Sequence, residues 1–216
     1  MGARGAQGLA VVGGLVLLVI GWLALRPASV SAPPKSSAQV VATPVDPQFA
    51  RLLPLPLRAL ALGMTVKELV AERPRAEPIA QLSEAGQLAY GEPLGADTQA
   101  IYLLDATSRT LLRVQLATQL TGERDIEPRI RQLEALHGPP SGVWDCEAKG
   151  APPTRRIGWF RGRFGLVEAF LIVNERIAVT RYLARAETLR ASLAEAACAP
   201  VPAERFSKFP VSPPTR

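Results

Sequence analysis

An uncharged apolar run near the amino terminus constrains this chain more than any other feature. No charged residue lies between Arg4 and Arg26, and Gly8–Leu25 reads GLAVVGGLVLLVIGWLAL. As an α-helix the uncharged residues span about 31 Å, close to the thickness of the hydrocarbon core of a bilayer. Trp22 suits the membrane interface where the helix emerges. We therefore predict a transmembrane anchor at residues 1–26.

A cleaved signal peptide is the alternative to a retained anchor. Val30-Ser31-Ala32 offers the small residues that a signal peptidase prefers. However, Pro33 follows directly, and the apolar run exceeds the roughly 7–15 residues of usual signal peptides. Retention is therefore favoured, with a secreted form as the other outcome.

The orientation of the anchor depends on weaker features. Positive charges on the two sides of the run nearly balance, but the short amino-terminal head favours a cytoplasmic N-terminus. Arginine outnumbers lysine 21 to 4, which indicates a GC-rich bacterial genome. We thus expect a single-pass protein of the inner membrane with its domain in the periplasm. Ala10, Gly14 and Gly21 fall near one helix face and could let two anchors pack together.

Proline clusters divide the remainder of the chain. Of 20 prolines, seven fall in residues 27–58 and five in residues 199–216. Because proline lacks a backbone donor and favours extended conformation, we predict a proline-rich tether and a disordered tail there. Residues 59–198 remain as one domain, large enough to bury a core without a metal.

The distribution of charge bears on the partner. The whole chain has a net charge of +6, but residues 59–198 carry 17 Lys+Arg and 17 Asp+Glu. A nucleic-acid-binding domain usually carries its own positive field. Nucleic acid is therefore not an expected partner.

A capping box marks the first helix of the domain. The Thr65 hydroxyl is placed to accept from the Glu68 backbone, and the Glu68 carboxylate can reach back. The helix should begin at Val66 and end near Arg73, because Pro74 disfavours helical geometry in the residue before it.

Two strands follow the first helix after a polar loop. Ala100–Leu104 and Thr110–Thr118 have strand-like composition around a turn. In the second strand, Leu112, Val114 and Leu116 alternate with polar residues, which predicts one buried face.

The same order then recurs. Asp125 is placed to cap a second helix, and Gly138 ends it. Its apolar face carries Ile126, Ile130, Leu133 and Leu136. Four strand-like segments follow at Gly142–Glu147, Arg155–Arg161, Leu166–Val173 and Arg176–Leu183, and a closing helix at Ala186–Cys198. We predict an α+β fold with helices packed on an antiparallel sheet, as a duplicated helix–strands unit.

The opening of the domain resembles a known group of modules. Leu62–Thr65, Glu68–Val70 and Arg73-Pro74 are similar to the GMT–x–x–(E/Q)–V…G–x–P opening of small bacterial envelope modules. These occur in β-lactamase inhibitor proteins and in the small outer-membrane lipoprotein of the barrel-assembly machinery. The resemblance covers roughly residues 60–183 and implies a binding or assembly role without catalysis. The second half offers only Leu133–Pro139 of the pattern, and no functional residue carries over.

Catalytic patterns are sparse. No glycine-rich phosphate loop, GxSxG or HExxH occurs, and the single histidine, His137, is expected to serve the end of the second helix. Two cysteines alone cannot form a zinc site. We expect no metal, no cofactor and no enzymatic activity, although an enzyme using acidic or Ser/Lys chemistry stays open.

The two cysteines have a different prediction. Export would place Cys146 and Cys198 in an oxidising compartment, where we predict a disulfide between them. Two small buried apolar residues are the alternative.

One arginine-rich stretch is the candidate binding surface. No carboxylate lies between residues 148 and 167. The candidate site residues are Arg155, Arg156, Trp159, Arg161 and Arg163. Arginine beside an aromatic residue is frequent in protein interfaces, so we expect another envelope protein as partner. An anionic lipid or glycan is the alternative ligand, and in a third interpretation Ile157 and Trp159 belong to the core.

Overall fold

A nine-stranded antiparallel sheet organises the domain in the computed structural model, which describes residues 42–83, 86–120, 126–147, 153–173 and 176–202. The strands are β1 (Glu77–Pro78), β2 (Gln87–Pro93), β3 (Thr98–Asp105), β4 (Leu111–Leu120), β5 (Gly142–Cys146), β6 (Thr154–Arg161), β7 (Phe164–Val173), β8 (Arg176–Arg185) and β9 (Cys198–Pro200). The helices are α2 (Pro47–Leu52), η1 (Leu55–Leu57), α3 (Val66–Glu72), η2 (Ala80–Leu82), α4 (Glu127–His137) and α5 (Ala186–Glu195).

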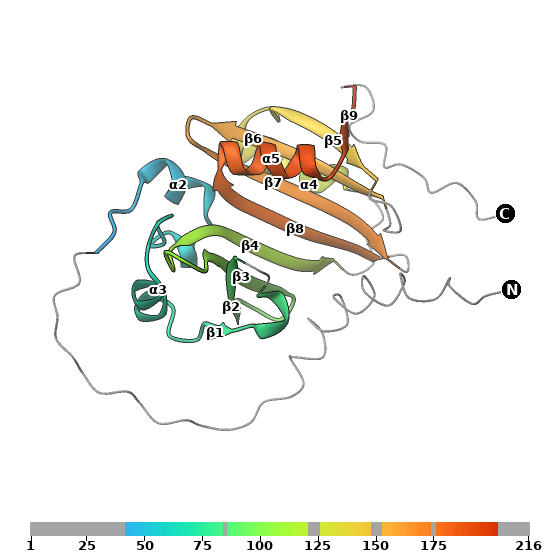
Figure 1. The fold of residues 1–216 in the computed structure, drawn as a ribbon. Helices are drawn as coiled ribbons and strands as arrows, with labels where there is room; N and C mark the ends of the chain where they lie inside the picture. The colour runs from blue at the N-terminus through green and yellow to red at the C-terminus, as the bar shows by residue number, and fades with distance from the viewer. Residues whose placement is uncertain (1–41, 84–85, 121–125, 148–152, 174–175, 203–216) are drawn as a thin grey trace, which may run out of the picture.

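Two similar halves meet in the middle of this sheet (Figure 1). The strand order is β1-β2-β3-β4-β8-β7-β6-β5-β9. Each half is a helix followed by four consecutive antiparallel strands, α3 with β1–β4 and α4 with β5–β8. Strands β4 and β8 pair antiparallel and join the halves. The α+β architecture with helices on an antiparallel sheet is thus confirmed.

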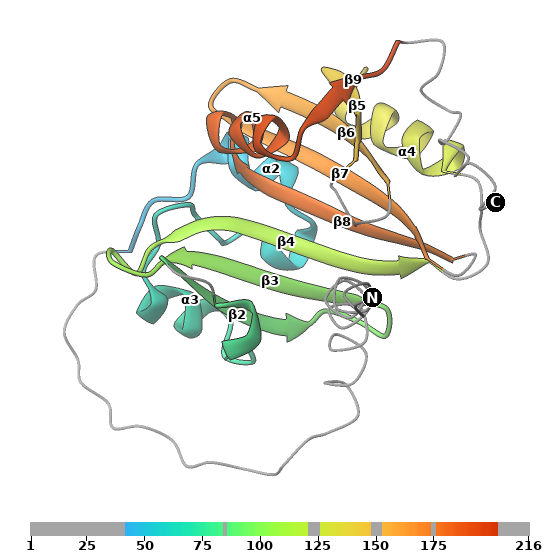
Figure 2. The same cartoon turned by 45° about the vertical axis from the view of Figure 1, so that its right-hand side comes forward.

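Helices cover both faces of the sheet (Figure 2). Successive strand residues point to opposite faces, so Leu166 and Val167 of β7 belong to different layers. Leu166 packs in the main core with Phe49 of α2 and Leu133 of α4. Val167 instead packs with Leu189 of α5. We call these two surfaces the α4 face and the α5 face.

The folded domain begins earlier than the sequence predicts. The predicted tether at residues 27–58 is wrong in its second part, because α2 and η1 bury Phe49 and Leu57 completely. Pro47 occupies the first turn of α2, where no intrahelical backbone donor is needed. Proline content in this segment therefore does not exclude helix. We call residues 42–58 the amino-terminal strap.

Side-chain contacts hold the strap to both halves. The Glu68 carboxylate accepts hydrogen bonds from the Thr43 backbone N–H at 2.6 Å and from its hydroxyl at 2.9 Å. Asp46 caps α2 and pairs with Arg163 at 2.7 Å. The strap thus contacts α3 and the β6–β7 hairpin at once.

In the first half of the domain, one prediction is confirmed and two need correction. The capping box at Thr65 and Glu68 is confirmed, and α3 ends at Glu72. The predicted polar loop before β3 contains β2, which glycine and proline residues disguise in the sequence. Leu112 is 40% exposed rather than buried. The pairing register shifts beside it, so that Leu104 faces Leu111 and Leu103 faces Arg113, and a bulge leaves Leu112 unpaired.

In the second half, α4 begins at Glu127 with Ile126 at its N-cap position, and Gly138 ends it with a φ of 73°. The predicted cap, Asp125, lies outside the described residues. Leu136 is 69% exposed, so the buried face of α4 is shorter than predicted. Strands β5 to β8 lie where the sequence predicts them.

The end of the domain also differs from expectation. Helix α5 stops at Glu195, and exposed Ala197 adopts a φ of 50°, which turns the chain back. Cys198–Pro200 then forms β9, so the predicted disordered tail at residues 199–216 is wrong at its start. The predicted disulfide between Cys146 and Cys198 is confirmed, with Cα atoms 4.1 Å apart, and it joins β9 to β5.

Both outermost strands of the described sheet carry proline on their free side. Val201 donates its N–H to Val143, so the alternate positions Pro200 and Pro202 direct their backbone nitrogens away from β5. Ile79 donates to Ala89 in the same way, which places Pro78 of β1 outward. Because proline has no N–H, neither edge offers a full row of donors to another strand.

The predicted membrane anchor, Gly8–Leu25, lies outside the described residues. Within the part of the chain that is described, no helix is long and apolar enough to cross a membrane.

Candidate binding hollow

The arginine-rich segment does not form one surface in the structure. Because β6 alternates, Arg155, Trp159 and Arg161 lie on the α4 face, whereas Arg156 lies on the α5 face. Arg163 lies in the turn to β7. Three of the five candidate residues, Arg155, Trp159 and Arg161, therefore share one face as the strand period predicts, whereas Arg156 lies on the other face and Arg163 in a hairpin turn.

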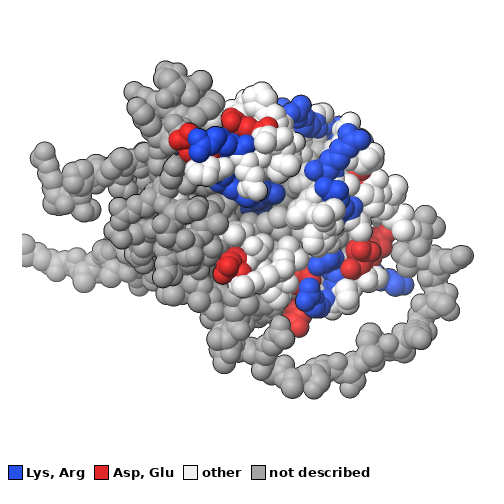
Figure 3. All heavy atoms as spheres, turned by 180° about the vertical axis from the view of Figure 1, so that it is seen from behind, with Lys and Arg blue, Asp and Glu red and all other residues white. Residues whose placement is uncertain are grey.

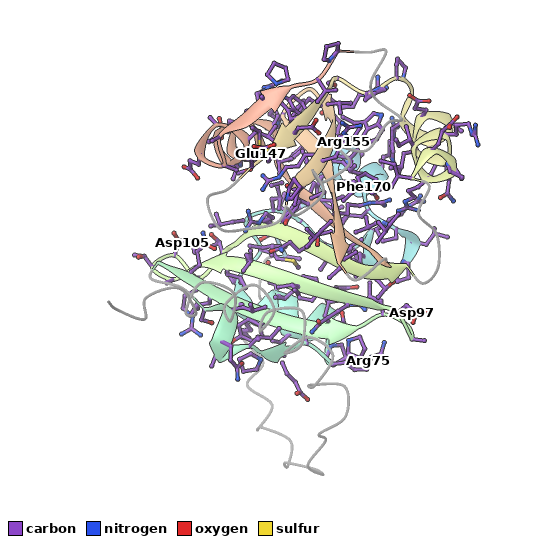
Figure 4. The ribbon with its side chains drawn as sticks, turned by 90° about the vertical axis from the view of Figure 1, so that its right-hand side faces the viewer. Arg75, Asp97, Asp105, Glu147, Arg155 and Phe170 are labelled. Carbon is purple, nitrogen blue, oxygen red and sulfur yellow. A yellow bond between two sulfur atoms is a disulfide. The ribbon has the colours of Figure 1, made fainter. Side chains whose placement is uncertain are left out.

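Arg155 serves the interior. It is 2% exposed, and its Nε and Nη2 atoms donate to the Asp145 carboxylate at 2.8 and 3.0 Å. It lies opposite Phe170 on the neighbouring strand (Figure 4). Asp145 is thus the partner of a buried guanidinium.

Trp159 and Arg161 hold the end of α4 on the sheet. Trp159 is 1% exposed and donates its Nε1–H to the Gly138 carbonyl at 2.8 Å. The Arg161 guanidinium donates to the His137 carbonyl. Helix C-termini leave such carbonyls without intrahelical partners, so these contacts satisfy them. The interpretation that placed Ile157 and Trp159 in the core is confirmed.

Arg163 is an exposed member of the candidate set. It is 73% exposed, pairs with Asp46 and lies over the Phe164 ring at 5.6 Å. On the α4 side of the molecule, basic side chains run down one margin and acidic ones interrupt them (Figure 3). This margin is an ordinary mixed surface rather than a concentrated positive field.

A hollow of about 410 Å³ lies on the α5 face of the second half. It is lined by Ser141, Trp144, Phe160, Arg190, Leu193, Ala194 and Cys198. Helix α5 forms one wall, strands β5 and β6 form the floor, and Cys198 of β9, which is disulfide-bonded to Cys146, completes the lining. Its size lies at the lower end of small-ligand pockets.

Three glycines make room for the aromatic floor. A Cβ atom at Gly142 would come within 2.6 Å of the Trp144 ring, and one at Gly158 within 2.9 Å. A Cβ atom at Gly165 would come within 2.6 Å of the Phe160 ring. The two rings therefore lie close against bare backbone, which fixes their height above the sheet.

Direct contacts order this floor further. The Trp144 and Phe160 rings meet edge to face at 6.2 Å, a favoured aromatic arrangement. The Arg190 guanidinium lies 4.6 Å from the centroid of the Phe160 ring. The Phe160 backbone N–H donates to Ser141 Oγ at 3.0 Å. The hollow thus combines two fixed rings with one exposed cation.

Two buried glutamates lie on the α4 face, away from the hollow. Glu168 is fully buried and accepts from Arg129 and Arg181, each at 2.8 Å or less. Glu92 is 1% exposed and accepts from Tyr102 at 2.6 Å and from Arg73. Both carboxylates are saturated by donors, which is the arrangement of structural ion pairs.

Burial also shifts the pKa values of two side chains on the α4 face. Burial first, and then the Glu92 carboxylate, raise the pKa of Tyr102. Burial, followed by the positive charge of Arg181, lowers the pKa of His137. Among the residues that the structure describes, no group of three or more His, Cys, Asp or Glu side chains could hold a metal ion.

The site residues predicted from the sequence do not include Trp144, Phe160 or Arg190. One pattern could have identified the floor. Gly142-Val143-Trp144 and Gly158-Trp159-Phe160 both read glycine–x–aromatic in strands that pair with each other. At a period of two, each glycine and its aromatic residue share a face, which predicts two rings over two glycines. Arg190 had no such signal, because the contact depends on where α5 packs.

Comparisons with family models, curated proteins and solved structures found no match to this chain, so its candidate site is defined by its own geometry.

Proposed function

We propose that this chain is a bitopic bacterial envelope protein whose extracytoplasmic domain binds another envelope component without catalysing a reaction. The hollow formed by Trp144, Phe160 and Arg190 is the proposed contact. It replaces the arginine-rich segment of β6 in that role, because Arg155 and Trp159 are buried in the domain.

One observation carries this proposal: a preformed aromatic floor with an arginine at its rim. Tryptophan and arginine are enriched among residues that dominate binding energy in interfaces. Rings that are already fixed lose little conformational entropy when a partner binds, so more of the contact energy appears as affinity. The ion pairs of Glu92 and Glu168, by contrast, lie inside the domain and offer nothing to a partner.

The two halves share a topology, but they differ on the α5 face. In the first half the α5 face is filled, because Ile79 lies 2.4 Å from where a Gly91 Cβ atom would stand and packs with Leu82 on the sheet. In the second half the corresponding region carries the hollow. We infer duplication followed by specialisation of the second half for binding.

The membrane part of the proposal rests on the sequence. The apolar run of Gly8–Leu25 has spanning length, and the proline-rich residues after it would hold the domain away from the bilayer. The domain itself would then meet partners on the far side of the inner membrane.

Site-specific photo-crosslinking of the full chain in its own membrane tests the proposal. A benzoylphenylalanine at Ala194, on the wall of the hollow, should give a discrete adduct, and Trp144→Ala in the same chain should remove it. A benzoylphenylalanine at Leu136, exposed on α4, is the control position. An adduct at Ala194 that survives Trp144→Ala at full strength, while the disulfide and fold persist, would refute the hollow as the contact.

A further inference from the structure

We infer that the hollow selects an acidic side chain next to an apolar one, presented by an internal segment of a protein partner. This inference rests on the proposed function and adds the chemistry of the ligand. Three properties of the hollow lead to it: the state of Arg190, the chemistry of the other lining groups, and the prolines at the sheet edges.

Arg190 supplies an uncommitted positive charge. Its guanidinium lies on the Phe160 ring, and among the described residues no carboxylate pairs with it. Contact with the ring covers part of the guanidinium, and because Arg190 is exposed, its N–H edge can be reached from solvent. A carboxylate at that edge would gain charge-assisted hydrogen bonds. No acidic side chain lines the hollow to repel it.

The remaining lining is apolar. Trp144, Phe160 and Leu193 offer rings and an aliphatic side chain, and the disulfide offers sulfur. A phenylalanine, leucine or methionine side chain would remove this surface from water at about 25 cal/mol per Å². An apolar group next to a carboxylate therefore matches the two parts of the hollow.

Sugars fit the lining less well. A glycan needs several hydrogen-bonding groups for its hydroxyls, and carbohydrate hydroxyls require acceptors as well as donors. Ser141 is the only lining side chain with a hydroxyl, and its Oγ already accepts from Phe160. The lining contains no carboxylate or amide side chain.

A chain-terminal carboxylate is also a poorer match than an acidic side chain. Terminal carboxylates are usually captured by clusters of backbone N–H groups. Here the Ser141 and Phe160 N–H groups are both committed, to the Gly158 carbonyl and to Ser141 Oγ. The Arg190 guanidinium is therefore the remaining donor in the lining. A single guanidinium suits a carboxylate on a flexible side chain.

The sheet edges make the hollow the more accessible contact for such a segment. Pro200, in the same short strand as Cys198 of the lining, and Pro202, after that strand, offer no backbone donors. A partner strand cannot extend the sheet there with a regular ladder of hydrogen bonds. The partner is thus held by its side chains.

Fluorine NMR of the full chain in detergent micelles, labelled with 5-fluorotryptophan, tests this inference. Trp144 gives the reporting signal, assigned with Trp144→Phe, while Trp22 and Trp159 serve as internal references. The probes are the capped dipeptide amides Ac-Glu-Phe-NH₂ and Ac-Gln-Phe-NH₂, the free acid Ac-Gln-Phe-OH, and glucuronate. We expect the Glu peptide to shift the Trp144 signal at about fivefold lower concentration than the Gln peptide, the difference that one exposed ion pair supplies.

Arg190→Gln should abolish this preference, and Arg185→Gln, an exposed arginine next to α5 but outside the hollow, should preserve it. Equal binding of the Glu and Gln peptides, or a preference that survives Arg190→Gln, would overturn the inference. So would stronger binding of the free acid or of glucuronate, which would assign the carboxylate to a chain end or to a glycan.

The two proposals fail in different ways. Crosslinking at Ala194 that depends on Trp144 would support the proposed function. If the peptides then show no acidic preference, the inference that the hollow selects an acidic side chain is refuted. If crosslinking fails and the peptides still discriminate, the hollow binds acidic–apolar segments that are not those of a stable envelope partner.

Discussion

Arg155 and Arg163 lie eight residues apart, yet the structure assigns them different energetic roles. Arg155 is buried against Asp145, and its loss would leave a carboxylate that is only 30% exposed without its partner. Removing one member of a buried pair costs about 3–5 kcal/mol. Arg163 pairs with Asp46 at the surface, where ion pairs contribute about 0–1 kcal/mol.

We therefore expect Arg155→Ser to lower the free energy of unfolding by about 3 kcal/mol and Arg163→Ser by less than about 1 kcal/mol. Urea unfolding of the full chain, followed by tryptophan fluorescence, measures both. Equal and small effects would show that the Arg155 pair contributes little.

Glu68 makes the attachment of the strap dependent on pH. The Thr65 backbone N–H, with the Thr43 backbone and both hydroxyls, lowers the pKa of Glu68 from 4.5 to about 2, against a smaller opposing effect of burial. A carboxylate whose pKa is depressed by folding stabilises the protein above its unfolded pKa. That contribution disappears as the pH falls from about 4.5 towards 2.

We expect the stability difference between the native chain and Glu68→Gln to be about 1 kcal/mol at pH 6, because the site is partly solvated, and to shrink below pH 4. Glu72→Gln, at an exposed position of the same helix, is the control. A difference between native and Glu68→Gln chains that is constant from pH 6 to pH 3 would contradict this assignment.

At the residue scale, the sequence predicts roles that depend on local spacing better than roles that depend on distant partners. The capping box of Thr65 and Glu68 is local, so its chemistry is readable from spacing alone. The arginines of β6 are not, because their roles depend on which strand or helix lies opposite: Asp145 for Arg155, the end of α4 for Arg161. Long-range partners of this kind leave no mark in the local pattern.

Among the elements, the two edge strands carry prolines that hinder the addition of further strands to the sheet. Pro78 and Pro200 hold outward positions where any other residue would present an N–H. We expect the double variant Pro78→Val/Pro200→Val to increase self-association of the full chain in sedimentation velocity. Pro47→Ala, in α2 and away from the sheet edges, should not. Unchanged association of the double variant would show that other features protect the edges.

The disulfide has a stability effect that depends on loop length. It joins residues 52 positions apart, and in the loop-entropy model such a bond contributes roughly 4 kcal/mol, with smaller values common in practice. Cys146→Ala/Cys198→Ala should lower the free energy of unfolding by up to that amount and detach β9. Because Cys198 lines the hollow, the Ala194 crosslink should weaken in the same variant. A retained crosslink with lowered stability would show that β9 stays in place without the bond.

Most elements could be predicted from sequence, and the missed ones share a cause. Strands β3 to β8 and helices α3 and α4 have clear periodicity with local start or stop signals. The missed segments α2, β2 and β9 contain proline or glycine at positions where the fold happens to tolerate them: a first helical turn, the end of a strand, and a sheet edge. Tolerance at such positions depends on neighbours that the sequence does not specify.

For the whole molecule, one core spans both halves. Tyr102 and Val114 of the first half belong to the same buried cluster as Trp159 and Leu183 of the second. A shared core predicts that the halves unfold together. Leu183→Ala, at a fully buried position of β8, should cost about 2–5 kcal/mol.

This loss should appear equally in two readouts: fluorescence of Trp159 in a chain carrying Trp22→Phe and Trp144→Phe for the second half, and hydrogen exchange of the β3 amides for the first. If β3 stays protected under conditions in which Trp159 is exposed, the halves are independent units and the shared core does not couple them.

The position of the strap has a mechanical consequence. A pulling force applied to the chain at residue 42 would first load the Thr43–Glu68 hydrogen bonds and then the Asp46–Arg163 ion pair. Thr43 and Asp46 both precede α2 in the sequence. Phe49 of α2 packs on the α4 face, which is opposite the hollow. Tension from a surface to which the chain is tethered would therefore peel the strap from its first contacts while leaving Trp144, Phe160 and Arg190 unstrained. The hollow would therefore keep its geometry while the attachment of the strap gives way.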